Sequence, residues 1–322
     1  MKRFEAALRA RFGERVQRDA PLAPLTTFKV GGPADLFVAV ASEEELRTAV
    51  QLAREHQSPL TVLGGGSNVL VADAGVRGLV LKLRNAEVRQ VDSGRIRADA
   101  GITINGLVRW TITHGLAGLE AWAGTPGTVG GAIYGNAHFR GRNISEYVEQ
   151  VRLIDRQGAI RDVPAAAMEF AYDYSRLHAT GEVVVSADFR AGHGDSEQLR
   201  EVARESLAYR KQTQPLAMPS AGCIFQNPSP ALDTMPPDIP WSAGALVDRA
   251  GLKGAQEGRA RVSPTHGNFI VNEGDATASE IRALIERCKQ AVWDRYRVGL
   301  REEIVYLGFA GDSTRHRQEA ED

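Results

Sequence analysis

The chain has 322 residues, 43% of them hydrophobic and 25% charged, and its 39 Lys and Arg nearly balance its 40 Asp and Glu. This length suits two or three domains rather than one ordinary core. The balanced charge argues against nucleic acid as a partner, and no stretch has the length of a membrane-crossing helix or the apolar run of a signal peptide. Two cysteines, Cys223 and Cys288, are too few for a disulfide scaffold, so we expect a cytoplasmic protein.

The first third of the chain contains predicted strands and helices. Residues 28–40 are typical of a strand interrupted by a Gly-Gly-Pro turn. Ser42 and Glu45 form a capping-box pattern that begins a helix with apolar positions up to Ala53. The apolar spacing from Ile104 predicts a second helix, which ends near His114.

The rest of the chain contains further predicted strands and helices. We expect a hairpin that turns at 157–158, a strand over 182–189, and helices over 196–209 and from Thr277 onward. Helices and strands alternate imperfectly, which favours an α+β fold over a doubly wound sheet.

Two glycine-rich segments stand out, LGGGSNVLVAD (63–73) and AGTPGTVGGA (123–132). The first could be a tight connection between strands or an anion cradle, in which bare N–H groups and the side chains of Ser67 and Asn68 donate to a phosphate. Its spacing fits neither the dinucleotide fingerprint nor the Walker A loop. Two such loops on separate elements suit a long diphosphate cofactor that is held from both sides.

Six segments follow one another between Thr26 and Gly308: TFKVGGPAD, LGGGSNVLVAD, GLEAWAGTPGTVGGAIYGNA, PSAGCIFQNP, AGLKG and VSPTHGNFIVN. Together they resemble the UDP-N-acetylenolpyruvoylglucosamine reductase (MurB) family, in its shorter subtype. The resemblance implies a flavoenzyme that uses FAD and NADPH to reduce UDP-N-acetylglucosamine enolpyruvate to UDP-N-acetylmuramate for peptidoglycan. We expect a monomer without a metal, since no Cys/His/carboxylate spacing suggests one.

The family fold implied is the FAD-binding fold of the vanillyl-alcohol-oxidase (PCMH) type, with two FAD subdomains and a C-terminal α+β substrate domain. On this basis we expect an FAD subdomain over 1–85, a second over 86–209, the substrate domain over 210–309 and a polar tail over 310–322. The residues that the resemblance places around FAD are Gly64, Gly65, Gly66, Ser67, Asn68, Thr125, Gly127, Gly130, Gly131 and Ala132.

The reaction implied leaves negative charge on the substrate carboxylate and needs an acid at the α-carbon. Many family members carry serine at the acid position, where this chain has Cys223. A thiol, with an ordinary pKa of about 8.5, is a better acid than an alcohol and stays mostly protonated at neutral pH. Its alternative role is a small buried hydrophobe, which we expect for Cys288. The family's C-terminal glutamate aligns with Glu303 rather than Glu302, although strand alternation does not decide between them.

Three residues are expected at the substrate by resemblance: Tyr172, Lys211 and Asn227. Lys211 could equally be a solvated surface lysine, and Asn227 could serve the turn before Pro228.

One departure concerns the substrate carboxylate. The family motif reads roughly F-x-Y-R-x-S, and its arginine meets that carboxylate, but FAYDYSRLH has Asp173 there. We expect Arg176 to supply the charge instead, with Lys211 as a further candidate. Two other functions stay open: an oxidase of the vanillyl-alcohol type, which has the same fold, and a flavin- or nucleotide-binding sensor without turnover, which the departure at Asp173 suggests.

Overall fold

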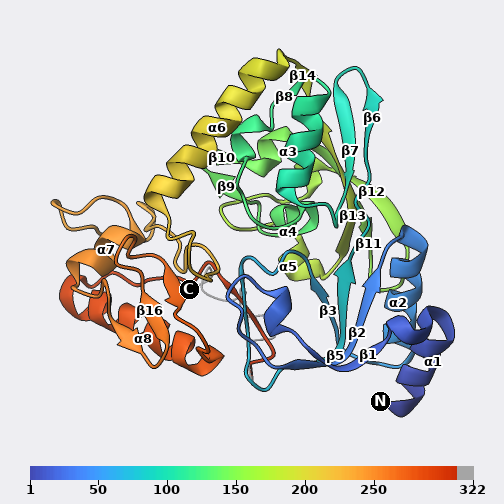
Figure 1. Cartoon of the computed structure of the whole chain (residues 1–322), viewed down its shortest axis with the longest axis horizontal. Coiled ribbons are helices and arrows are strands. Elements are labelled where there is room, and N and C mark those ends of the chain that lie inside the picture. The colour runs from blue at the N-terminus through green and yellow to red at the C-terminus, as the bar shows by residue number, and fades with distance from the viewer. Residues whose placement is uncertain (310–322) are drawn as a thin grey trace.

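The structure is a computed structural model that describes residues 1–309, so the predicted polar tail lies outside the described residues. The first part of the chain forms a four-stranded sheet whose order is β1 (Gln17–Pro21), β2 (Pro33–Val40), β5 (Val76–Leu83), β3 (Leu60–Leu63). β2, β5 and β3 run parallel, and β1 is antiparallel to β2. The helices α1 (Lys2–Phe12) and α2 (Glu43–Glu55) pack together, and their buried residues share one core with those of β2 and β5 (Figure 1).

In this part the predicted helix cap forms, and the predicted strand begins later than expected. Ser42 Oγ accepts a hydrogen bond of 3.1 Å from the Glu45 N–H at the start of α2. The strand expected over 28–40 begins only at Pro33, because Lys29 and Gly31 have φ of 59° and 128° and cannot continue an extended chain.

The second part is built on an antiparallel sheet in the order β12 (Ile160–Pro164), β11 (Val148–Ile154), β13 (Val183–Arg190), β7 (Arg95–Asp99), β6 (Val88–Asp92). The helix α4 (Val129–Tyr134) packs on β13 and β7, and α3 (Ile104–Thr113) packs on α6 (Ser196–Thr213). The remaining elements are α5 (Leu177–Thr180) and the two-residue strands β8 (Leu116–Ala117), β9 (His138–Phe139), β10 (Arg142–Asn143) and β14 (Gly192–His193).

The C-terminal part lies beside the other two, and α6 extends toward it (Figure 1). It contains α7 (Ala243–Arg249), α8 (Ala278–Tyr296) and a small antiparallel sheet of β15 (Gln256–Glu257), β16 (Ala260–Val262) and β17 (Ile270–Asn272). Thr277 and Glu280 form the capping box of α8. Phe28, Val30 and Leu70 from the first part join this core, so the domains share buried surface.

The chain finally returns to its first part. The strand β18 (Val305–Leu307) pairs in parallel with β4 (Val69–Val71), which lies in the second half of the first glycine-rich segment. The predicted domain boundaries at residues 85 and 209 stay predictions. β18 belongs to the predicted substrate domain, but it pairs with β4 of the predicted first FAD subdomain. Among residues 1–309, no helix combines the length and the apolar character needed to cross a membrane.

Candidate active site

The two glycine segments lie directly against each other. An added Cβ on Gly65 would stand 2.5 Å from Gly127 Cα, and one on Gly64 would stand 2.7 Å from Thr128 Oγ1. Gly66 has a positive φ of 65°, and its Cβ would stand 2.3 Å from the Leu25 carbonyl oxygen. We expected this backbone to be bare because a pyrophosphate lies against it; the structure adds that the protein's own packing requires it.

These loops nevertheless keep hydrogen-bond donors free. Among residues 1–309, the N–H groups of Gly65, Gly66, Ser67, Gly127 and Thr128 donate to no other protein atom. Successive free N–H groups of this kind form a concave site for an anion. The two loops therefore present one continuous donor surface.

The end of the second segment is used differently. The N–H of Gly130 donates to Ala100 O at 2.9 Å, and the N–H of Gly131 donates to Thr128 Oγ1 at 3.4 Å. Ala132 is 7% exposed and belongs to the core of the second part. These three residues anchor α4 behind the donor surface.

The segment that carries Glu303 is held between the first loop and the cysteine segment. Asn68 Nδ2 donates to the Glu303 carbonyl at 3.1 Å, and the Val305 N–H donates to Asn68 O at 2.9 Å. The Glu303 N–H donates to Ile224 O at 2.8 Å. The structure thus brings Asn68, Cys223 and Glu303 into one place, although 235 residues separate the first from the last.

The side chain of Cys223 faces charged groups. Burial raises the pKa of its thiol, and the carboxylates of Glu303 and Asp173 raise it further, whereas Arg210 lowers it. The thiol therefore holds its proton at neutral pH, as an acid that protonates carbon must. Cys288 lies on the buried face of α8, as expected for a structural cysteine.

Beside the thiol lies a cluster of His138, Asp173 and Glu303, whose nearest ligand-type atoms are within 4.8 Å of one another. His138 Nδ1 pairs with Asp173 Oδ1 at 3.0 Å, and this hydrogen bond raises the pKa of His138. Burial, followed by the Asp173 carboxylate, raises the pKa of Glu303 to about 8. Glu303 is therefore mainly a neutral acid at pH 7. Within residues 1–309 this cluster is the only candidate metal site, although we predicted none.

Two residues expected at the substrate lie together beside this cluster. The Tyr172 hydroxyl accepts a hydrogen bond of 3.4 Å from the Asn227 N–H, and its ring centroid is 4.8 Å from that of His138. Asn227 Oδ1 accepts from the Ala243 N–H at 3.1 Å, at the start of α7. Tyr172 is 45% exposed, which leaves much of its ring open to a ligand.

The third expected residue, Lys211, is exposed and makes no hydrogen bond or ion pair with any residue that the structure describes. Its neighbour Arg210 is 5% exposed instead. Arg210 Nη2 donates to Thr125 Oγ1 at 2.7 Å, and its guanidinium lies 3.7 Å from the centre of the Phe139 ring. Burial lowers the pKa of Arg210 to about 10, so it stays charged at pH 7, and its buried Nε has no protein partner within residues 1–309.

Arg176 is engaged elsewhere. Its Nε donates to Glu182 Oε2 at 3.2 Å, and its Nη1 donates to Ala167 O at 3.2 Å. Glu182 is 7% exposed and also pairs with Arg161. None of these described contacts reaches Asp173 or Glu303, so the role expected for Arg176 at the substrate stays a prediction without geometric support.

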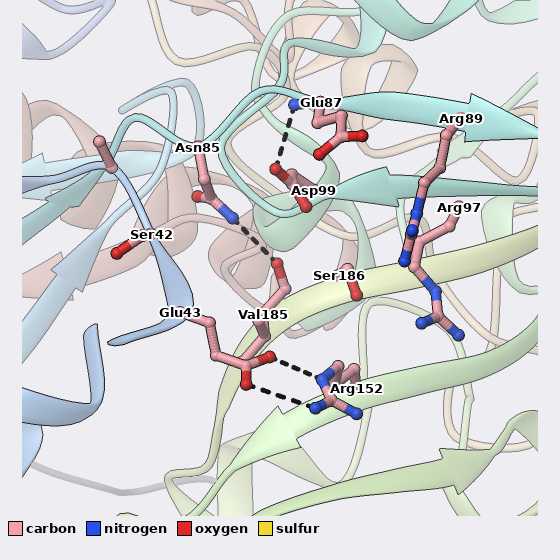
Figure 2. A pocket seen from close by; sticks show the side chains of 11 residues that line it. Ser42, Glu43, Asn85, Glu87, Arg89, Arg97, Asp99, Arg152, Val185 and Ser186 are labelled. Carbon is pink, nitrogen blue, oxygen red and sulfur yellow. Dashed lines mark hydrogen bonds and ion pairs between the residues drawn. The ribbon is translucent and has the colours of Figure 1, made fainter. Parts of the chain in front are cut away.

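A polar pocket of about 410 Å³ lies apart from these residues (Figure 2). Figure 2 shows that two of its carboxylates already have partners: Glu43 pairs with Arg152, and Asp99 accepts from the Glu87 N–H. Arg97, also in its lining, pairs with Asp188. None of the predicted site residues lines this pocket, so we do not assign the reaction to it.

Comparison with known proteins agrees with this geometry. Residues 34–164 match the FAD binding domain model, and residues 214–307 match the model of the UDP-N-acetylenolpyruvoylglucosamine reductase C-terminal domain. The UDP-N-acetylenolpyruvoylglucosamine reductase of Heliobacterium modesticaldum is 40% identical over 300 residues, covering 93% of this chain and 92% of that protein. The chain belongs to the UDP-N-acetylenolpyruvoylglucosamine reductase family. The reductase of Halalkalibacterium halodurans is 36% identical and covers 96% of this chain and 99% of its own.

A crystal structure supports the same assignment. The family member from Thermus caldophilus (MurB) is 34% identical, with a TM-score of 0.75 over 91% of this chain and 99% of that chain. The predicted α+β fold of the PCMH type and the predicted FAD binding are confirmed. The shorter subtype, the domain boundaries and the site residues stay predictions.

The residues present fit FAD. A diphosphate matches the free N–H groups of the two loops, and the buried, unpaired Nε of Arg210 needs an acceptor that no described residue supplies. Sequence reasoning missed Arg210 and His138. The predicted helix over 196–209 stops one residue before Arg210, whereas α6 continues to Thr213. The sequence signal for His138 was indirect. Asp173 stands where the family motif has arginine, which indicates that another cation lies nearby.

Proposed function

We propose that this chain catalyses the NADPH-dependent reduction of UDP-N-acetylglucosamine enolpyruvate to UDP-N-acetylmuramate, in peptidoglycan synthesis. Family membership over more than nine-tenths of the chain supports the reaction. The observation that carries it is the clamp of Glu303 between Asn68 and Ile224, which joins the donor-rich loop to the cysteine segment.

We assign the binding of FAD to the two glycine loops and Arg210. Held there, FAD would supply the hydride chemistry that links NADPH to the β-carbon of the enol ether. Arg210 is fixed by Thr125 and the Phe139 ring, so it presents its charge without losing side-chain freedom on binding. Its Nε and the loop N–H groups supply the donors that an anionic cofactor requires.

The proton chemistry belongs to Cys223 and Glu303. The Cys223 thiol, held protonated mainly by burial, donates its proton to the α-carbon and becomes a thiolate. Glu303, neutral at pH 7, donates a hydrogen bond to the substrate carboxylate as negative charge grows there. Tyr172 and Asn227, which lie together beside these groups, contact the nucleotide sugar.

Anaerobic mixing tests the function. The reductase loses its flavin absorbance with NADPH and regains it when the enolpyruvyl substrate is added. Recovery only with oxygen would make the chain an oxidase of the vanillyl-alcohol type, and no bleaching would make it a binding sensor.

Substitution at Cys223 tests the assigned acid. Cys223→Ser keeps a proton donor and should retain appreciable reoxidation by substrate, whereas Cys223→Ala should lose about 100-fold or more. Cys288→Ser is the matched control, because Cys288 lies in the core of the C-terminal part. Wild-type reoxidation in Cys223→Ala would refute the role.

We also propose a cytoplasmic monomer, with both thiols free as the structure has them. Light scattering on the purified protein measures the oligomeric state directly. A dimer would contradict this part alone.

A further inference from the structure

The site binds an anion, yet it has a carboxylate where the family motif has arginine. Asp173 sits in the left-handed region with φ of 53°, in a tight turn closed by a bridge between Ala171 and Tyr174. Asp is among the few residues that tolerate this backbone. Its Oδ2 is shielded from water and accepts no hydrogen bond within residues 1–309. A second negative charge at this place would oppose the charge that develops on the substrate.

Neither Arg176 nor Arg210 supplies the missing cation. Arg176 holds the buried carboxylate of Glu182, and Arg210 is fixed on Thr125 and the ring of Phe139. The cation that faces both Asp173 and Glu303 is instead His138, from the short strand β9. The Asp173 carboxylate stabilises its imidazolium form.

The orientation of His138 is set from two sides. Asp173 accepts from Nδ1, which leaves Nε2 as the free edge of the ring, and Nε2 has no partner among residues 1–309. The Tyr172 ring lies tilted over the imidazole at 4.8 Å and 39°. An imidazole held by a carboxylate at Nδ1 presents a directed N–H donor at Nε2, an arrangement that serves catalysis in other enzymes.

We propose that protonated His138, oriented by Asp173, replaces the motif arginine and donates its Nε2–H to the carboxylate of the enolpyruvyl substrate, beside neutral Glu303. His138 is thus the residue that touches substrate, and Asp173 is a positioning residue. This inference rests on the proposed function. It accounts for the acid at position 173, because that acid serves the histidine and not the substrate.

The replacement makes the site pH-dependent in a way that arginine would not. The groups that face His138 are Asp173 and Tyr172 from one loop and Glu303 from the C-terminal segment. The same two carboxylates act on Cys223, and so does Arg210. As pH rises through the pKa of His138, the cation is lost and the substrate carboxylate loses its partner. Glu303 deprotonation adds a second falling limb at about pH 8.

The test measures reoxidation of the NADPH-reduced flavin by the enolpyruvyl substrate across a pH series. His138→Gln should slow reoxidation about 100-fold at pH 6 and abolish the falling limb assigned to His138. The double variant His138→Gln/Asp173→Arg restores the motif arginine and should recover about tenfold or more, without that limb. His193→Gln, an exposed histidine on β14, is the control and should match the unmodified chain.

Two measurements do not depend on turnover. Calorimetric titration of the oxidised protein with the substrate should show about tenfold weaker binding in His138→Gln at pH 6. Asp173→Asn should move the His138 limb to more acid pH, and NMR titration of the His138 ring should show the same fall in its pKa.

The outcomes distinguish a failure of the proposed function from a failure of the inference about His138. If the unmodified chain is bleached by NADPH and not reoxidised by substrate, the proposed function fails. If it is reoxidised, but His138→Gln keeps its rate within about twofold and its pH profile, the inference about His138 is overturned. An unmoved limb in Asp173→Asn overturns the positioning role.

Discussion

Asn68 Nδ2 donates a hydrogen bond of 3.1 Å to the carbonyl of Glu303, so a residue of the glycine loop fixes the backbone of the proposed acid. The same loop supplies the free N–H groups assigned to the diphosphate. One short segment therefore sets the position of the cofactor relative to Glu303. A shift of about 1 Å in such a position is enough to slow a reaction strongly.

Asn68→Ala should slow reoxidation by the substrate by about tenfold or more, because the Glu303 segment loses this tie. Stopped-flow measurement on FAD-saturated protein checks the effect. Asn85→Ala is the matched control, since Asn85 Nδ2 makes a similar bond of 3.2 Å to Val185 O, away from the thiol. Equal rates in the two variants would contradict the role of Asn68.

Gly65→Ala should destabilise the protein by about 1–3 kcal/mol even after FAD has been removed, because the added Cβ meets Gly127 Cα. Urea unfolding of the FAD-free protein measures this change. Gly192→Ala, where nothing lies within 4 Å of the added Cβ, should stay within about 0.5 kcal/mol. If Gly65→Ala weakens FAD binding but leaves FAD-free stability intact, the ligand alone keeps the backbone bare.

Arg210→Ala should weaken FAD binding by about 10- to 100-fold, the loss expected for charge-assisted hydrogen bonds. Fluorescence titration of FAD-free protein measures the dissociation constant. Arg204→Ala, on the exposed side of α6, should bind FAD normally.

Lys211→Ala tests whether Lys211 contacts the substrate. A raised KM for the nucleotide sugar would support a substrate contact, and an unchanged KM would leave Lys211 on the surface.

Arg176→Ala should lower stability by about 1–3 kcal/mol, because Glu182 loses a partner where it is buried. Thermal unfolding and turnover are measured on the same samples, with Arg161→Ala as the comparison, since Arg161 pairs with the same carboxylate. A loss of turnover by orders of magnitude at unchanged stability would restore Arg176 to the substrate and count against His138.

The stability of the folded chain should fall as pH rises between the ordinary pKa of a glutamate, about 4.5, and about 8. Over this range the folded state keeps the proton on Glu303 while the unfolded state releases it, so deprotonation favours unfolding. Glu303→Gln should flatten this slope, and urea unfolding at several pH values measures it. An unchanged slope would show that the pKa of Glu303 is not raised.

Neighbouring residues show what the sequence left open. Helical and strand periodicity did not separate Glu302 from Glu303; in the structure Glu302 pairs with Lys289 at 2.8 Å, and Glu303 faces the thiol. Lys211 and Arg210 are likewise adjacent, and the extra turn of α6 turns Arg210 inward and Lys211 outward. Resemblance to the family motif named Glu303 and Lys211, and these roles stay predictions; the directions of the neighbouring side chains come from the structure alone.

The sequence by itself determined the helix starts at Ser42 and Thr277, the order of the glycine and cysteine segments, and the family. These features depend on neighbours in the chain, and a local pattern records them fully. Only the tertiary structure decided that Gly65 meets Gly127, that Asn68 ties Glu303, and that Asp173 pairs with His138. Such pairs form when distant segments pack, because burial and charge select partners by position in space and leave no fixed spacing along the chain.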